Sequence, residues 1–443
     1  VTTMANHSPL DSFRPRATQA VIAYAVVMAL LVRFVFTGTG LLDTLAFVAL
    51  LFSVYLATDD RRATGAARVA VLVGVLFVAL PLIGLHNTFY LDVVTQVGIY
   101  AVLALGLNIV VGFAGLLDLG FIAFFAVGAY LWAILGSAHG SVLFATSSLP
   151  LPPEAFFVVV ILGIAVAALA GVLLGLPVLR LKGDYLAIVT LGFGEVIRVL
   201  ANNLDKPINI TNGPQGITGI RQPLSDVAQA LTSAAVPEFK WQALAYYGIV
   251  LGFVAIAVVV NRRLGSSHIG RAWVAIRENE IAAQAMGLPL VRTKLIAFAT
   301  GAAFAGAMGA LFAAKQTFVS PESFDFNQSI GVLAMIVFGG LGSIRGAMVG
   351  AALVTILNLQ VLKALSSGLN HLRSTGFEVL GWSFANLPTQ LEPSKYEKLI
   401  FGLILIVMIL YRPRGLVPAE RRSIHVDIPA GSGVAATVQG RTK

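Results

Sequence analysis

Polar side chains recur along one face of an otherwise apolar segment, residues 185–201. Glu195 and Arg198 lie within this segment. Together with Asp184, Ile188, Leu191 and Asn202 they follow the three- and four-residue spacing of one helix face. Charges at the depth of a bilayer cost several kcal/mol, so they usually face protein or a water-filled path. Two interpretations stay open: the four polar residues line a path through the membrane, or Glu195 and Arg198 form an ion pair that fastens the helix to its neighbours.

A second pattern occupies a polar connection, residues 262–294. Gly270 is placed to open a helix, and Gly287, with Pro289 behind it, is placed to close it. Arg277 and Glu280 have the spacing of an i,i+3 ion pair. One face of this helix carries a single carboxylate flanked by small residues: Ile276, Glu280, Ala283 and Gly287. The pattern predicts a short helix parallel to the membrane that docks on a cytoplasmic partner or, alternatively, rests on lipid headgroups.

Residue types that build common catalytic, metal and cofactor sites are absent or dispersed. There is no cysteine, and the six histidines form neither an HExxH motif nor a pair at helical spacing. No Gly-Lys dipeptide occurs, so the chain has no P-loop for ATP. The glycine-rich string 339–346 lacks the GxGxxG spacing and lies between two apolar runs, which predicts close helix packing or a tight turn. We therefore assign no catalytic, metal-binding or cofactor-binding residue, and a membrane enzyme has no support among the motifs.

The whole chain of 443 residues is too apolar for a water-soluble fold. Hydrophobic residues make up 57% and charged residues 12%, against about 25% charged in an ordinary soluble domain. The mean hydropathy of +0.86 indicates an all-α, polytopic transmembrane helical bundle. The net charge of +9 then reflects loops on the cytoplasmic face of a lipid bilayer rather than binding of nucleic acid.

Ten to twelve segments are long and apolar enough to cross about 30 Å of hydrocarbon, and twelve is the working number. They are residues 19–36, 41–57, 69–85, 93–111, 119–136, 155–179, 185–201, 243–261, 295–315, 329–341, 346–366 and 396–411. The segments 119–136 and 329–341 are short or glycine-rich and are compatible with broken or re-entrant helices. No basic region leads directly into a short apolar core at the start, so the first apolar stretch is expected to remain as an anchor.

The distribution of basic residues predicts the orientation. With the N-terminus inside, 20 of the 30 Lys and Arg residues fall in cytoplasmic connections and 5 in outside ones. This predicts cytoplasmic tails at 1–18 and 412–443, a transmembrane domain at 19–411, and long outside connections at 202–242 and 367–395. The C-terminal tail is expected to fray beyond Arg422.

Five stretches in order along the chain resemble the LivM-type permeases of branched-chain amino-acid importers. The loop 262–294 contains GRAWVAIRENEIAA at 270–283, and its continuation to Gly287 resembles the E-A-A…G signature of ABC-importer permeases. The other four stretches are GLNIVVGFAGLLDLG at 106–120, LKGDYLAIVTLGFGE at 181–195, KQTFVSPESF at 315–324 and YRPRGLVP at 411–418. The family-like core runs from about residue 93 to 411, whereas the first three spans carry no such motif, and 367–395 looks longer and more polar than the family's usual connection.

The resemblance implies one of two unlike permease subunits of a bacterial inner-membrane importer. A second permease subunit, two cytoplasmic ATPase subunits and a periplasmic amino-acid-binding protein would complete the machine, and the ATPases would bind the ATP. The loop would supply the ATPase-coupling residues Gly270, Arg271, Arg277, Glu280, Ala282, Ala283 and Gly287. An amino-acid substrate is a zwitterion and needs complementary charge along its route, which Glu195 and Arg198 offer. Two alternatives remain: the same type of importer for urea, short amides or other amino acids, and an ion-coupled secondary transporter.

Overall fold

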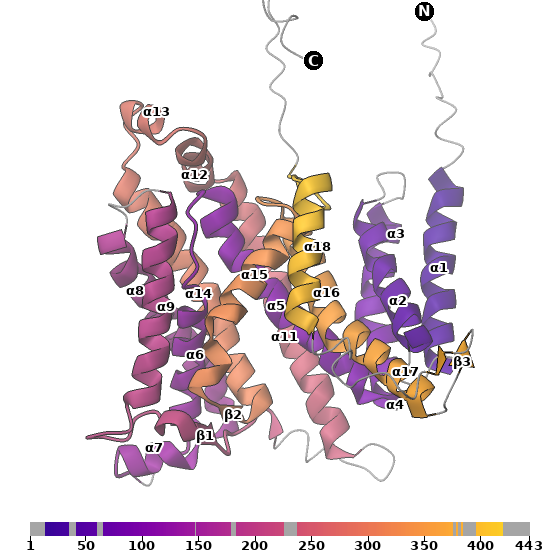
Figure 1. Ribbon diagram of the computed structural model, residues 1–443, viewed down its shortest axis with the longest axis horizontal. Helices are drawn as coiled ribbons and strands as arrows, with labels where there is room; N and C mark the ends of the chain where they lie inside the picture. The colour runs from indigo at the N-terminus through magenta and orange to yellow at the C-terminus, as the bar shows by residue number, and fades with distance from the viewer. Residues whose placement is uncertain are drawn as a thin grey trace, which may run out of the picture.

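The fold is a bundle of helices, as the composition predicts (Figure 1). The computed structural model describes residues 14–34, 41–59, 65–146, 148–178, 183–225, 237–374, 378–379, 382–383 and 396–419. Within these ranges, strands occur only as two antiparallel pairs of two residues each. β1 (Ile217–Thr218) pairs with β2 (Phe318–Val319), and β3 (Glu378–Val379) pairs with β4 (Trp382–Ser383). The all-α class is confirmed.

Each of the twelve expected spans coincides with helix. Seven helices in the described part are long and apolar enough to cross a membrane, and four shorter apolar helices accompany them. The spans correspond to α1 (Arg14–Phe34), α2 (Leu41–Asp59), α3 (Gly65–Val73) with η1 (Gly74–Ala79) and α4 (Leu80–His86), α5 (Thr88–Leu107) with η2 (Asn108–Phe113), α6 (Ile122–Leu135), α8 (Phe156–Val178), α9 (Asp184–Asn203), α11 (Glu238–Ser266), α14 (Leu290–Gln316), α15 (Phe326–Gly339), α16 (Ile344–Ile356) with η6 (Leu357–Val361) and α17 (Leu362–Ser374), and α18 (Glu397–Tyr411).

The two segments that looked broken in the sequence are short helices. α6 and α15 have 14 residues each. At 1.5 Å per residue each covers about 21 Å, less than the thickness of the hydrocarbon layer. Irregular chain at 114–121 leads into α6, and the short helix η5 (Pro321–Phe324) leads into α15. Non-helical backbone at this depth is tolerated where protein surrounds it, and most residues of 114–121 are buried.

Some helices extend beyond the expected membrane spans. α1 already begins at Arg14, inside the expected tail 1–18, and α17 continues to Ser374, inside the expected loop 367–395. The first residues of the expected C-terminal tail are also ordered against the bundle, because Leu416 N–H donates to Phe338 O and Val417 N–H to Gly339 O. Residues 1–13 and 420–443, including the part expected to fray beyond Arg422, lie outside the described residues.

The packing centre of the bundle is α14, which lies against α8 and α6. Small residues allow the close approach: a Cβ added to Gly128 of α6 would lie 2.0 Å from the Gly306 carbonyl oxygen of α14. α1 to α4 form a second apolar cluster with parts of α5 and α11 and stand beside the main bundle (Figure 1). The helices that carry family-like motifs therefore build the core that positions the candidate sites.

Candidate functional site

The expected helix over 270–287 is two helices, α12 (His268–Glu278) and α13 (Glu280–Ala285). Ser267, rather than Gly270, begins the first one, because its hydroxyl accepts the Gly270 N–H at 3.1 Å. Asn279 then adopts an extended conformation and caps α13, with its Oδ1 accepting the Ala282 N–H at 3.0 Å. The single helix was a wrong prediction because an asparagine cap in its middle offers the backbone an alternative to helix.

Gly287 closes the second helix, as the sequence predicts. It has a φ of 82°, the left-handed conformation that favours glycine. Leu288 N–H donates to Ala283 O at 3.2 Å and Gly287 N–H to Gln284 O at 2.9 Å, which is the hydrogen-bond pair of a Schellman motif. The hairpin of α12 and α13 therefore has a defined end before α14 begins.

The predicted Arg277–Glu280 ion pair does not form. Lys294 Nζ instead lies 2.7 Å from Glu280 Oε1, and the Lys294 side chain is only 4% exposed. Arg277 turns the other way and donates from Nη1 to the carbonyl oxygen of Gly112, at the end of η2. The break at Asn279 separates the two residues, because they no longer share one helix face. The sequence analysis did not predict Lys294 as the partner of Glu280, although a lysine near the start of an apolar helix is recognisable in the sequence.

The surface that the hairpin exposes also differs from the helix face that was predicted to dock on a partner. Ala283 is buried, whereas Ile281 and Met286 are 74% and 84% exposed. Ala282 lies on the exposed side as well. α13 stands at the far end of the bundle (Figure 1). Exposed apolar side chains on a polar loop are typical of a contact surface, and we call Ile281, Ala282 and Met286 the hairpin face.

Two of the predicted coupling residues, Gly270 and Arg271, lie on α12, which Trp273 holds in place. Gly270 has no room for a side chain, because a Cβ there would lie 2.1 Å from the Leu264 carbonyl oxygen. Arg271 is exposed and donates to Ser266 O at 2.9 Å. Trp273 is fully buried, with its Nε1 donating to Thr293 O at 2.8 Å. α12 is thus fixed to the start of α14 on one side and, through Arg277, to η2 on the other.

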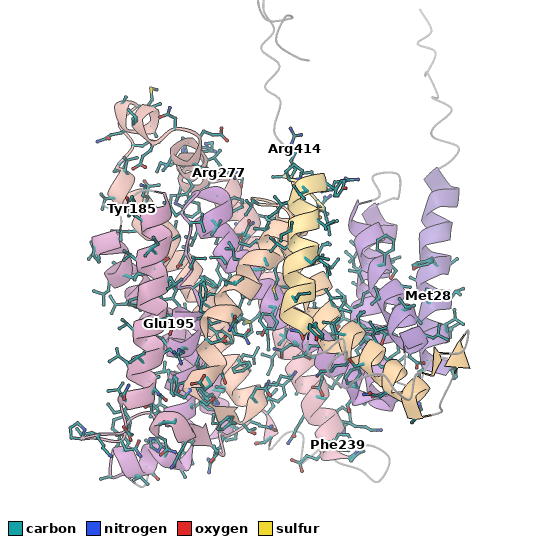
Figure 2. The ribbon with its side chains drawn as sticks, in the orientation of Figure 1. Met28, Tyr185, Glu195, Phe239, Arg277 and Arg414 are labelled. Carbon is teal, nitrogen blue, oxygen red and sulfur yellow. The ribbon has the colours of Figure 1, made fainter. Side chains whose placement is uncertain are left out.

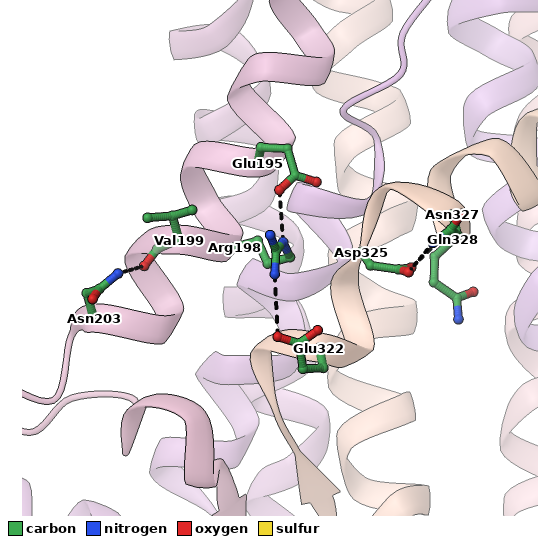
Figure 3. Close-up of polar contacts among 8 residues, drawn as sticks. All are labelled: Glu195, Arg198, Val199, Asn203, Glu322, Asp325, Asn327 and Gln328. Atoms are coloured by element: carbon green, nitrogen blue, oxygen red, sulfur yellow. Dashed lines mark hydrogen bonds and ion pairs between the residues drawn. The ribbon is translucent and has the colours of Figure 1, made fainter.

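On α9, Glu195 and Arg198 form the ion pair that one interpretation expected, and a third charge joins them (Figure 3). Arg198 Nε lies 2.9 Å from Glu195 Oε2, and Arg198 Nη1 lies 3.4 Å from Glu322 Oε1. Glu322 comes from η5, which follows β2. The sequence analysis missed it, although it stands inside the family-like stretch 315–324. We call Glu195, Arg198 and Glu322 the charge cluster.

The other two predicted path residues are not part of this cluster. α9 begins at Asp184, whose side chain is outside the described residues. Asn202 lies near the opposite end of the helix, about 27 Å away at 1.5 Å per residue. A Cβ added to Gly213, in the turn that follows α9, would lie 3.1 Å from the Asn202 carbonyl oxygen. The four polar residues share a helix but not one site.

The charge cluster is exposed on the surface of this chain. The side chains of Glu195, Arg198 and Glu322 are 35%, 28% and 72% exposed. Glu195 lies about midway along α9, on which Tyr185 marks one end (Figure 2). Glu195 and Arg198 belong to a helix long and apolar enough to cross a membrane, where ionised groups usually face protein or water. With one cation and two carboxylates, the cluster can bind both the carboxylate and the ammonium group of a zwitterion.

A cavity of about 220 Å³ lies between η5 and the helices α5, α6, α14 and α15. Its polar lining comes from three glutamines, a tyrosine and a serine: Gln96, Tyr100, Gln316, Ser323 and Gln328. The Tyr100 hydroxyl donates to Gln328 Oε1 at 3.1 Å. Since Glu322 faces Arg198 and the next residue, Ser323, lines the cavity, η5 separates the charge cluster from a neutral polar pocket. Within the described residues, no cluster of His, Asp or Glu could hold a metal ion.

Comparison with known proteins decides what kind of protein carries these features. The sequence model of the branched-chain amino acid transport system / permease component family matches residues 89–409. The chain belongs to this permease family. The match begins in α5, so α1 to α4 lie before it, and it contains both the hairpin and the charge cluster. The protein is therefore a multi-pass transport permease of the inner membrane.

Individual relatives agree with the family match. The high-affinity branched-chain amino acid transport system permease protein LivM of Escherichia coli is 37% identical over 377 residues, which cover 82% of this chain and 77% of the relative. LivM of Salmonella typhimurium is 37% identical over 78% of this chain and 74% of its own length. A probable LivM of Methanocaldococcus jannaschii is 24% identical over 73% of this chain and 91% of its own. No solved structure matches the chain.

Proposed function

We propose that this permease is one of two unlike membrane subunits of an ATP-driven importer that carries branched-chain amino acids across the bacterial inner membrane. The observation that carries the proposal is the similarity to the two LivM proteins, 37% identical over about four fifths of the chain. The second permease subunit, a pair of cytoplasmic ATPases and a periplasmic amino-acid-binding protein are the partners. A probable LivH permease is a further, partial relative, 28% identical over 39% of this chain.

The ATPase docks, on this proposal, against the hairpin of α12 and α13. Two features support this position. The hairpin face exposes Ile281 and Met286, which would be buried in a groove of the partner. The hairpin is also anchored through Trp273 and Arg277 of α12, so a displacement of the partner would move the helix as a unit. The residues Gly270, Arg271, Arg277, Glu280, Ala282, Ala283 and Gly287 then share the coupling role, with Gly270, Arg277, Glu280 and Ala283 acting from within the fold.

The substrate path runs along α9 in this proposal. An exposed charge cluster in the middle of a membrane helix needs a cover, and the second permease subunit with a water-filled path between the two chains supplies it. Arg198 would hold the substrate carboxylate, while Glu195 and Glu322 would hold its ammonium group. Asp184 and Asn202 would mark the two ends of the same route.

The proposed orientation places the hairpin and both chain ends in the cytoplasm. Arg277 and Arg414 lie at one end of the bundle and Phe239 lies at the opposite end (Figure 2). Because the chain has no cysteine, single cysteines can report the side of each loop. We expect Gln215→Cys to react with a membrane-impermeant maleimide in intact spheroplasts and Met286→Cys to react only after permeabilisation. The opposite pattern would invert the orientation and remove the hairpin from the ATPase side.

The function is tested by reconstituting the permease with its second permease subunit, the ATPases and the binding protein in liposomes. We expect uptake of leucine that requires ATP and all partners, and little uptake of urea. Uptake of urea but not leucine would favour an amide importer of the same type. Uptake driven by an ion gradient with this chain alone would instead favour a secondary transporter and contradict the proposal.

A further inference from the structure

Arg277 joins the coupling hairpin to the end of a membrane helix. Its Nη1 donates to the Gly112 carbonyl oxygen in the last turn of η2. Carbonyl groups in that position lack partners within their own helix and carry partial negative charge, so they hold a guanidinium firmly. The side-chain stem of Arg277 rests on Gly115, where an added Cβ would lie 2.7 Å from Arg277 Cγ. α12 is therefore fastened to the beginning of the irregular segment 114–121.

The other end of this segment is fastened to α9. Leu119 N–H donates to Thr190 Oγ1 at 3.0 Å, and Thr190 is fully buried. Gly120 lies so close to α9 that a Cβ on it would be 2.0 Å from the Thr190 carbonyl oxygen, and a Cβ on Gly194 would be 3.2 Å from Gly120 Cα. Gly194 directly precedes Glu195 of the charge cluster. Leu119, Gly194 and Glu195 line one shallow hollow.

η2 itself is held in place by the turn that follows α15, which lies next to the Gly112 carbonyl oxygen that Arg277 binds. Gly342 N–H donates to Asn108 Oδ1 at 2.9 Å, and Asn108 is fully buried. The chain after α18 is joined to the end of α15, directly before this turn, by two backbone hydrogen bonds. Leu416 and Val417 donate them to the last residues of α15. η2 is helical and fixed by these contacts, whereas 114–121 forms no helix. A displacement of Arg277 is therefore resisted at η2 and passes along the irregular segment, which the Arg277 stem contacts at Gly115.

We propose that residues 114–121 act as a rod that transmits displacement of α12 to α9, with Arg277 and Thr190 as the positioning residues at its two joints. The proposal deepens the proposed function and rests on it, because α12 is displaced only if an ATPase docks on the hairpin. The rod pushes or draws α9 at Thr190 and Gly194, next to the charge cluster. When ATP closes the ATPase pair at the cytoplasmic end, the displacement of α12 thereby changes the position of the charge cluster relative to the substrate. η2 belongs to the π-helices, which are frequent at functional sites.

The test follows the environment of α9 in the complete complex with its second permease subunit and ATPases. A nitroxide label on Val196→Cys, 54% exposed and next to Glu195, reports the surroundings of the helix. In the otherwise unchanged chain, we expect the spectrum to change on addition of ATP. Arg277→Ala and Thr190→Val are each expected to reduce this change at least about fivefold, because each removes the hydrogen bond at one joint, from Arg277 to Gly112 O or from Leu119 N–H to Thr190. Both should still co-purify with the ATPases and hydrolyse ATP.

Two matched controls separate the rod from general damage. Thr190→Ser keeps the hydroxyl that accepts from Leu119, and Glu278→Ala removes an exposed charge beside Arg277; both should keep the response to ATP. Retention of the response in either Arg277→Ala or Thr190→Val would overturn the rod. Loss of ATPase binding in Arg277→Ala would also overturn it, since Arg277 would then belong to the docking surface. Absence of ATP-driven uptake and of any response in the unchanged complex would instead refute the proposed function itself.

Discussion

Glu280→Lys is expected to abolish ATP-driven uptake, and the additional change Lys294→Glu is expected to restore it. In the single variant two ammonium groups face each other where Lys294 is 4% exposed and Glu280 is 27% exposed. Leaving a buried charge without its partner costs on the order of 3 kcal/mol. That free energy is sufficient to detach α13 from the start of α14 and to lower the fraction of correctly placed hairpins about a hundredfold.

The measurement is ATP-dependent leucine uptake in proteoliposomes, together with the amount of ATPase that co-purifies. Glu278→Lys is the matched control, because it makes the same charge change at an exposed position two residues away. The exchanged pair Glu280→Lys/Lys294→Glu should recover most of the uptake, since it restores an ion pair between the two positions with the charges exchanged. If the exchanged pair stays inactive while the hairpin is intact, Glu280 contacts the ATPase directly, and its role is not to hold α13.

Arg198→Gln is expected to lower uptake at least about tenfold while ATPase binding stays normal. The change leaves two carboxylates, Glu195 and Glu322, facing each other without the cation between them, and it removes the group proposed to hold the substrate carboxylate. The expected size follows from the loss of charge-assisted hydrogen bonds. Arg198→Lys should recover only part of the uptake, because one ammonium group does not reproduce the separate contacts that Nε and Nη1 make.

The double variant Glu195→Gln/Arg198→Gln separates the two interpretations of this pair. It removes both charges but keeps side chains of similar size that can hydrogen-bond to each other. If the pair has only a structural role, through its contacts within α9 and to Glu322, the double variant should transport normally, because the glutamine amides can still hydrogen-bond to each other and to Glu322. On our proposal it should remain defective. Asn203→Ala is the control on the same helix, because among the described residues the Asn203 side chain donates to Val199 O of its own helix. Uptake by the double variant at the normal rate would remove the charge cluster from the path.

Much of the architecture could be predicted from the sequence, because the signals for it are local. Long apolar segments define the membrane helices, since a bilayer requires a continuous apolar stretch whatever the rest of the chain does. The three- and four-residue spacing on α9 correctly placed Glu195 and Arg198 within bonding distance. The glycine that ends α13 was also recognisable, because a left-handed residue at a helix end is a local requirement. The break at Asn279 has an equally local signal, an asparagine cap, which the helix prediction overlooked.

The tertiary structure decided which partner each charged side chain takes. Glu280 has Arg277 three residues away but pairs with Lys294, 14 positions along the chain, and Arg277 reaches Gly112, 165 positions away. Arg198 gains Glu322 across 124 positions, and Leu119 meets Thr190 across 71. Spacing along one helix predicts neighbours only on that helix, whereas these contacts depend on how separate helices pack. The sequence by itself therefore determined a membrane permease with a polar connecting loop and a polar helix face, and the packing alone determined that contacts through 114–121 join the two.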